Sequence, residues 1–386
     1  MGPLAGIRII EITGLGAGPF CGMMLTDMGA EVIRVDRVTD QPMQDHGPMS
    51  RSRKSIAIDL KKPAGVETLL RLVKTADALF EGFRPGVAER LGFGPDVCLS
   101  CNPRLVYGRI TGWGQEGPLA HAAGHDINYI ALSGALAAIG RAGEKPVPPL
   151  NLVGDFGGGG LLLAFGVVCA LLEAGKSGKG QVVDAAMLDG ANALMALFHG
   201  FRAAGTFDGA TGTHFFGGAA HYYDTYETSD GKYISIGSIE PQFYEELIDV
   251  LGLDKDRFMR WAFRQKIDAP TRTAWRELKG ELADVFRSKT RAEWSQLLEG
   301  TDVCFAPVLS VDEAIEHPHN KARQTFVNVG GVVQNAPAPR FSGTPTARPS
   351  PPQAPGADTI EILKSINFSA DEIRKLRASG AVVQAS

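Results

Sequence analysis

Short apolar runs alternate with helical patterns over residues 6–110, and this alternation restricts the fold more than any other feature of the chain. The runs are rich in Ile and Val, and glycine or proline marks several of the breaks between them. The predicted strands are 6–12, 31–35, 55–59, 77–81 and 104–110. Strands that alternate with helices predict a parallel sheet with helices on both faces, so we expect an α/β fold.

The sequence changes character after the first half. Residues 205–222 are rich in glycine, small residues and aromatics, and from Tyr223 a hairpin pattern turns at Asp230 and Gly231 before several amphipathic helices. A Pro-rich segment follows at 334–356, and two final helix patterns include a capping box at Ser369 and Glu372. We expect a large α/β domain at 1–190 completed by 330–386, a linker at 191–222, a smaller α+β domain at 223–318 and a return linker at 319–329.

The composition is that of a soluble globular protein, with 44% hydrophobic and 21% charged residues. A formal net charge of −4 does not favour binding to nucleic acid or to an acidic membrane. The longest apolar run, at 161–172, is too short to span a bilayer, and the five cysteines favour a reducing compartment. We expect a cytoplasmic protein without a metal, because Cys98 and Cys101 have no second ligand pair.

The first glycine turn suggests a dinucleotide site, because an acid, Asp36, follows GLGAGP at the spacing of about 20 residues that such sites use. The glycines are spaced GxGxGP rather than GxGxxG, however, and Arg37 follows the acid. A guanidinium holds a phosphate group through a rigid fork of donors. The turn therefore favours a plain tight turn or a phosphate-binding variant over an NAD site.

Residues 124–160 contain two titratable groups at breaks in the backbone. His125 lies in GHDIN, and Asp155 lies just before Gly157–Gly160. If the two face each other across a pocket, one removes a proton from carbon and the other delivers one to the opposite face. The carbanion needs an adjacent carbonyl, preferably of a thioester, and an N–H donor such as that of Asp126. The alternative is structural, with a hydrogen-bonded histidine and an aspartate in a turn or cap.

Several longer motifs resemble one family. They are GHDINYIALSG, PLNLVGDFGGGG, GKGQVVDAAMLDG, YYDTYETSDGKY, IEPQFYEEL and DVCFAPVLS. In this order and at these intervals they look like the family III CoA-transferase (CaiB/BaiF) superfamily and, within it, the α-methylacyl-CoA racemases. The resemblance runs from Leu4 to about Pro345.

The resemblance implies an isomerase that interconverts (R)- and (S)-2-methylacyl-CoA thioesters by 1,1-proton transfer through an enolate. It makes His125 and Asp155 the two acid/base groups, and places Glu240 on His125 from the small domain of the other subunit. A carboxylate in that position would fix the tautomer of the imidazole. Asn151 and Tyr223 would lie near the reacting centre. Structural alternatives stay open for three of these residues: Glu240 precedes Pro241 and is a candidate helix cap, and Asn151 and Tyr223 are candidates for a purely structural role.

The resemblance also implies how coenzyme A is bound, as part of the substrate and with no other cofactor. Its contacts would fall on these residues: Arg37 for the 3′-phosphate, Ile58, Asp59, Leu60, Lys61, Arg84 or Arg90, and Gly124, His125, Asp126, Ile127, Asn128 and Tyr129. The family fold has a Rossmann-like large domain made from both chain ends and a small domain, and two chains interlock as a homodimer. A long linker and a Pro-rich segment suit such wrapping.

Three other functions remain open at this point. A CoA transferase on the same fold would use Asp155 as the nucleophile and form an acyl-aspartyl anhydride. An NAD(P)-dependent oxidoreductase would use the first glycine turn. A non-enzymatic acyl-CoA-binding protein would keep Arg37 and the pocket without needing both His125 and Asp155.

Overall fold

The computed structural model describes residues 2–38, 47–263 and 267–385, which divide into two compact units. The first comprises residues 1–133, 150–194 and 323–386, so it is built from both ends of the chain, and the second comprises 134–149 and 195–322. These boundaries differ from those expected. Residues 134–149 belong to the second unit, and the region expected as a linker is shared between α8 (Met187–Leu194) of the first unit and α9 (Ala196–Ala203) of the second.

The first unit contains a seven-stranded sheet in the order β12-β3-β2-β1-β4-β5-β6. Its strands are β1 (Arg8–Ile12), β2 (Glu31–Asp36), β3 (Lys54–Ile58), β4 (Ala78–Glu81), β5 (Val106–Thr111), β6 (Gln181–Ala186) and β12 (Val382–Val383). All neighbours pair in parallel except β12, which is antiparallel to β3. Runs such as Ile9–Ile12 are buried on both faces, as central strands of a covered parallel sheet must be. The predicted α/β class with a parallel main sheet is confirmed.

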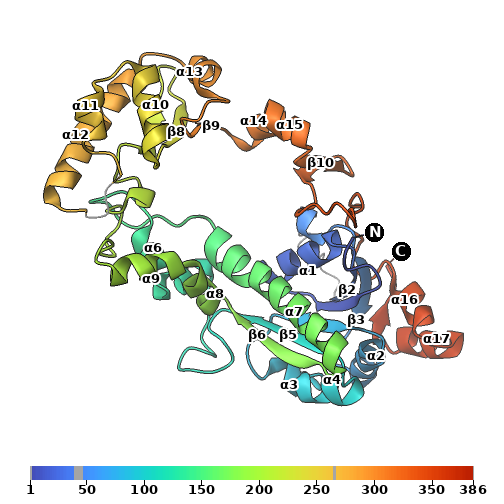
Figure 1. The fold of residues 1–386 in the computed structure, drawn as a ribbon. Helices are drawn as coiled ribbons and strands as arrows, with labels where there is room; N and C mark the ends of the chain where they lie inside the picture. Colours follow the sequence, from blue (N-terminus) through green and yellow to red (C-terminus); the bar gives the residue numbers. More distant parts are fainter. Residues whose placement is uncertain (1, 39–46, 264–266, 386) are drawn as a thin grey trace. The chain divides into compact units, whose positions relative to one another are not determined.

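Helices cover both faces of this sheet, and the alternation of side chains along each strand feeds two cores (Figure 1). Ile9 of β1 joins the core under α1 and α7, whereas Ile10 joins the core under α2, α4, α16 and α17. The helices of this unit are α1 (Ala17–Asp27), α2 (Pro63–Val73), α3 (Val87–Leu91), α4 (Pro95–Cys101), α5 (Asp126–Leu132), α7 (Leu162–Ser177), α8, α16 (Thr359–Ser365) and α17 (Ala370–Ala378), with a short 3-10 turn, η1 (Gly47–Ser50).

The helix before β6 starts earlier than the sequence suggests. A π-helical segment, η2 (Leu152–Leu161), runs directly into α7 and makes one predominantly apolar helix of 26 residues, Leu152–Ser177. By length and composition alone this helix could cross a membrane, so the expectation that its apolar run is too short is wrong. Its inner side, including Leu163 and Val167, is buried on β5 and β6, while 39% of its most apolar window is buried overall.

The C-terminal part returns to the first unit, as expected. It forms the hairpin β10 (Phe326–Val329) and β11 (Val332–Asn335), an irregular Pro-rich segment, and then α16, α17 and β12 (Figure 1). Ser369 and Glu372 make the predicted capping box at α17. The hairpin and β12 were not anticipated.

The second unit combines a small antiparallel sheet with helices. The sheet has the order β7-β8-β9 and consists of β7 (Tyr223–Glu227), β8 (Tyr233–Gly237) and β9 (Phe305–Val308), with the predicted turn at Asp230 and Gly231 between β7 and β8. The helices are α6 (Ala135–Ala138), α9, η3 (Phe215–Gly217), α10 (Pro241–Leu251), α11 (Lys255–Met259), α12 (Ala269–Phe286), α13 (Arg291–Leu298), α14 (Val311–Glu316) and, at its boundary, α15 (Pro318–Arg323). Tyr222, Tyr244 and Trp275 lie at the centre of its core.

Candidate active site

The carboxyl ends of the parallel strands form the edge at which the candidate residues of the first unit gather. The chain leaves β1 toward β2 on one side, and β4 lies on the other, so β1 marks the point where strand order reverses. Open α/β sheets bind ligands outside the carboxyl ends of their strands at such a point. Arg37 follows β2, residues 59–61 follow β3, and Arg84 follows β4. Arg37, Lys61, Arg84 and Arg90 are exposed.

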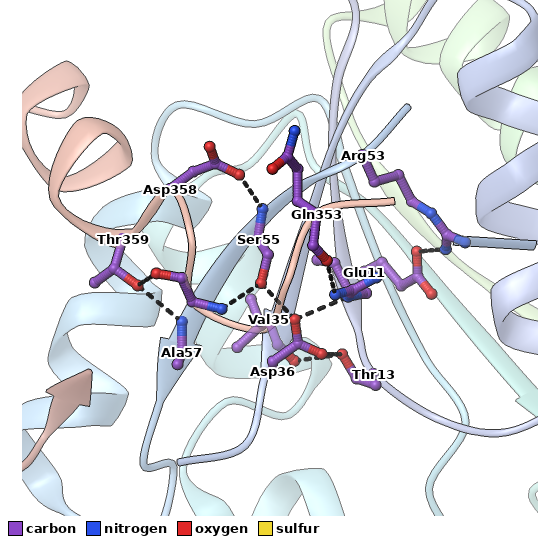
Figure 2. A network of polar contacts seen from close by, with 12 residues as sticks. Glu11, Thr13, Val35, Asp36, Arg53, Ser55, Ala57, Gln353, Asp358 and Thr359 are labelled. Carbon is purple, nitrogen blue, oxygen red and sulfur yellow. Dashed lines mark hydrogen bonds and ion pairs between the residues drawn. The ribbon is translucent and has the colours of Figure 1, made fainter. Parts of the chain in front are cut away.

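Asp36 is the structural anchor of this edge rather than a ligand group. It is 2% exposed, and Thr13 Oγ1 donates to its Oδ1 at 2.9 Å while Arg34 Nε donates to its Oδ2 at 2.8 Å. Ser55 Oγ donates to the same Oδ2, and the Ser55 N–H donates to Asp358 at 2.8 Å (Figure 2). Because Asp36 is buried and both of its oxygens bond to protein groups, it is not accessible to a ribose, so the dinucleotide alternative loses its acidic residue. The network instead ties the C-terminal segment to β2 and β3 beneath Arg37.

A hollow of about 600 Å³ lies at the start of α2. Its lining includes Leu60, Lys61 and Arg90 of the predicted CoA residues, together with Lys62. The lining carries three cations and one carboxylate, Glu67, around apolar side chains, so its net positive charge suits an anionic ligand group. Lys62 was missed because the motif match ended at Lys61. Ile58 does not contribute its side chain, since that side chain is 2% exposed within the core.

A partly buried ion-pair network anchors α3, the helix that carries Arg90. Arg109 on β5 is paired with Glu81 at 3.0 Å and with Glu89, one residue before Arg90 on α3, at 2.9 Å. Burial raises the pKa of Glu81 to about 7, against the opposing bond from Phe83 N–H and the charge of Arg109. The network therefore fixes α3, and with it Arg90, next to the hollow.

His125 is the N-cap residue of α5 and is exposed. Its backbone is extended, with φ −133° and ψ 173°, and its N–H donates to Asn128 Oδ1 at 3.0 Å. This arrangement fixes the histidine backbone and leaves the first-turn N–H of Asp126 without an acceptor inside the helix, as at every helix start. Asn128 thus supports the histidine.

Tyr129 packs against the loop that precedes α5. Its side chain is 7% exposed, its hydroxyl donates to the Gly124 carbonyl, and its ring lies edge-on to Trp113 with ring centres 4.8 Å apart. A Cβ at Gly112 would lie 2.1 Å from the Tyr129 ring, so the glycine is required there. The buried ring of Tyr129 is part of the loop's support rather than its binding surface, whereas Ile127 is 43% exposed.

Asp155 lies in the π-helical segment and is half-buried. Burial raises the pKa of its carboxyl; a hydrogen bond from Asn151 Nδ2 at 3.2 Å opposes that rise, the charge of Asp126 adds to it, and the charge of His125 lowers it. The Asp155 N–H donates to Oδ2 of Asp126 at 2.7 Å, and Asp126 directly follows His125, so the backbones of the two candidate groups lie near one another. The sequence placed Asn151 only near the reacting centre, and the structure shows that it contacts the candidate acid itself.

The first glycine turn faces Asp155. Gly16 has φ +63° and is the N-cap of α1, and a Cβ there would lie 3.2 Å from Asp155 Oδ2. A side chain at this position would be strained and would cover the carboxylate. The turn that suggested a dinucleotide site thus keeps Asp155 accessible, a role that nothing in the local sequence indicates.

The glycines after Asp155 face the protein interior. A Cβ on Gly158 would lie 2.7 Å from Ala191 N of α8, and one on Gly160 would lie 2.5 Å from Ala17 O of α1. Gly158–Gly160 are buried and therefore do not open a path for a substrate toward Asp155. They let the π-helical segment sit directly on two neighbouring helices.

Glu240 and Tyr223 belong to the second unit. Glu240 is the exposed N-cap residue of α10 and its side chain makes no capping hydrogen bond, so the structural alternative of a side-chain cap is not observed. Tyr223 begins β7, opposite Gly237, and its half-buried ring contacts Phe215 and Phe216. Their relation to His125 stays a prediction.

The profile of the CoA-transferase family III matches residues 4–359. The chain belongs to this family. It is 43% identical to the α-methylacyl-CoA racemase of Mus musculus over 98% of this chain and 97% of that protein, and 44% identical to that of Homo sapiens over 97% and 96%. The crystal structure of Rv3272 from M. tuberculosis, whose protein is named a probable fatty acyl-CoA transferase, superposes with a TM-score of 0.77 at 29% identity, covering 93% of this chain and 98% of that one. The resemblance drawn from the motifs, and the expectation of an enzyme, are confirmed.

Proposed function

We propose that this enzyme interconverts (R)- and (S)-2-methylacyl-CoA by 1,1-proton transfer at Cα, with His125 and Asp155 as the two acid/base groups. The observation that carries the proposal is the placement of an exposed histidine and a half-buried aspartate at the carboxyl edge of a parallel sheet, where Asp126, next to His125, accepts from the Asp155 N–H at 2.7 Å. Similarity to racemases over nearly the whole length supports the same reaction.

The proposed chemistry needs one proton shared between two groups. Either group removes the Cα proton, the thioester becomes an enolate, and the other group protonates the opposite face. Burial and the Asp126 charge raise the pKa of Asp155, which brings its proton affinity nearer to that of an imidazole. The first-turn N–H of Asp126 is the proposed donor to the enolate oxygen, where the positive end of α5 favours negative charge. We also propose that Glu240 orients the imidazole.

Coenzyme A is the part of the substrate through which we propose the enzyme binds it. Arg37 would bind the 3′-phosphate, and Lys61, Lys62 and Arg90 would hold the rest of the nucleotide at the hollow near α2. Exposed cations at a strand edge match a group with several phosphate charges. Arg84 would meet the pyrophosphate from the loop after β4.

We further propose that a second copy of this chain covers the outer side of α7. This outer stripe consists of Leu161, Phe165, Val168 and Leu172, which are 39% to 66% exposed and recur at helical spacing. Contiguous exposed apolar side chains of this kind mark interaction surfaces. The stripe supports a dimer, which we take to be the interlocked homodimer that the motifs imply.

The test is deuterium incorporation. In deuterated water, either epimer of a 2-methylacyl-CoA should gain deuterium at Cα and approach a near-equal mixture. His125→Ala and Asp155→Ala should abolish interconversion, because each face then lacks its proton donor or acceptor. Full exchange in both variants would overturn the two-base proposal.

The transferase alternative is favoured by one observation, the access to Asp155 that Gly16 preserves, which an attacking nucleophile also needs. The two functions separate on one readout. Movement of CoA to an added free carboxylate without Cα exchange would establish the transferase, and exchange without an acceptor would establish the racemase.

A further inference from the structure

The side chain of Asp126 links the two halves of the candidate site. Asp126 is the first residue of α5 and is only 6% exposed. Its Oδ2 accepts from the N–H of Gly154 and from the N–H of Asp155, each at 2.7 Å. A Cβ on Gly154 would lie 2.6 Å from that oxygen, so the approach requires glycine.

We propose that Asp126 is a positioning residue that holds Asp155 at a fixed place relative to His125. The inference rests on the proposed function, in which these two groups act on one Cα. Asp126 directly follows His125 in the chain, and its carboxylate accepts a hydrogen bond from the backbone N–H of Asp155. One side chain therefore connects the backbones of both acid/base groups through two charge-assisted bonds, which are about twice as strong as neutral ones.

A second observation makes the carboxylate unusual. Within the part of the chain that the structure describes, Asp126 Oδ1 is buried and has no hydrogen-bond partner. Leaving a charged oxygen buried and unpaired costs free energy, so an asparagine would serve a purely structural contact at lower cost. Retaining the charge fits an electrostatic role toward Asp155, whose pKa the Asp126 charge raises in addition to burial.

Few other groups act on Asp155. On its own helix Asn151 donates to it, and from α5 it is faced by His125, by Asp126 and by the neutral phenol of Tyr129. From α1 it meets Gly16, and the ring of Phe20 stacks on the adjacent Phe156. The acid of α8, Asp189, is exposed and acts on Asp184 instead.

The experiment compares Asp126→Asn, Asp126→Ala and the control Asp189→Asn, which removes the same charge from a neighbouring helix without touching Asp155. The first readout is the carboxyl ¹³C resonance of Asp155 as a function of pH, assigned by its loss in Asp155→Asn. The second is Cα deuterium exchange together with the affinity for CoA.

We expect Asp126→Asn, whose amide oxygen can still accept the two bonds, to lower the pH at which Asp155 titrates and to move the acidic limb of the exchange profile with it. Asp126→Ala should lose about 10²-fold in exchange, as for a displacement of about 1 Å, with CoA affinity unchanged. Asp189→Asn should change neither readout.

An unchanged Asp155 titration in Asp126→Asn overturns the inference, and so does wild-type exchange in a folded Asp126→Ala. If Asp126→Ala does not fold, the titration of Asp126→Asn decides. Failure of the proposed function looks different, because the wild-type protein would then show no exchange while the Asp155 titration still shifts between wild type and Asp126→Asn.

Discussion

Replacing Gly190 with alanine should displace Asp155 without touching it. Gly190 lies on α8, and a Cβ there would lie 1.8 Å from the carbonyl oxygen of Gly158 in the π-helical segment. Real Cβ atoms essentially never come within 3.0 Å of such an atom. The two backbones must therefore separate by at least 3.0 − 1.8 = 1.2 Å. No flexible side chain can absorb the shift, because both partners are backbone.

Two effects should follow from this separation. Overpacking of a close contact costs about 1–3 kcal/mol of unfolding free energy. A misplacement of about 1 Å at a catalytic group costs about 10²-fold in rate, so exchange should fall by that order while affinity for CoA is kept.

The matched control is Gly175→Ala. Gly175 lies on α7, which continues the helix that contains Asp155, and an added Cβ there would have nothing within 4 Å. Alanine should stabilise that site by about 1 kcal/mol through helix propensity. Deuterium exchange, CoA binding and denaturant unfolding are measured for all three proteins. Wild-type exchange in Gly190→Ala would refute the view that glycine contacts place Asp155.

Three further results are expected. Arg37→Ala should weaken CoA binding, measured by calorimetry, about 10- to 100-fold, because it removes a charged hydrogen bond, and should leave the binding of 3′-dephospho-CoA unchanged. Equal losses for the two ligands would exclude the contact with the 3′-phosphate. Phe165→Asp should yield monomers in sedimentation, because it puts a charge in the outer stripe, and a persistent dimer would place the interface elsewhere. Burial lowers the pKa of His221 to about 3, so the folded protein keeps this histidine neutral and loses about 2 kcal/mol of stability from it as the pH falls from 7 to 5. His221→Gln should lack that loss when its stability is measured by denaturant unfolding at each pH. An unchanged pH dependence of stability would contradict the assignment.

The parts of the fold that follow from local sequence patterns were predictable. The strand order over residues 6–110 follows from periodicity and from the glycine and proline breaks, and the capping box of α17 was predicted at the residues where it occurs. His125, Asp155 and Asn151 were likewise identified as site candidates from motifs, and in the structure Asn151 donates a hydrogen bond to Asp155, while the catalytic roles of all three stay predictions.

The parts that depend on distant contacts were not predictable in this way. Glycine after an aspartate is typical of a turn, yet Gly158 continues a helix because Gly190, far along the chain, leaves room for its backbone. The two-residue strand β12 is too short for any periodicity, and it exists because β3 offers an unpaired edge. Asp36 has the spacing of a ribose ligand, and only Ser55 and Thr13 show that it is already satisfied.

The path of the chain between His125 and Asp155 explains why the site needs such supports. The chain leaves the first unit after Ser133, contributes residues 134–149 to the second, and returns at Leu150. Within the second unit this excursion is anchored by Arg141, which pairs with Asp224 and Thr225. The connecting segment therefore belongs to another body and cannot set the separation of the two acid/base groups. That separation must come from contacts made inside the first unit, and the carboxylate of Asp126 is the contact that reaches both.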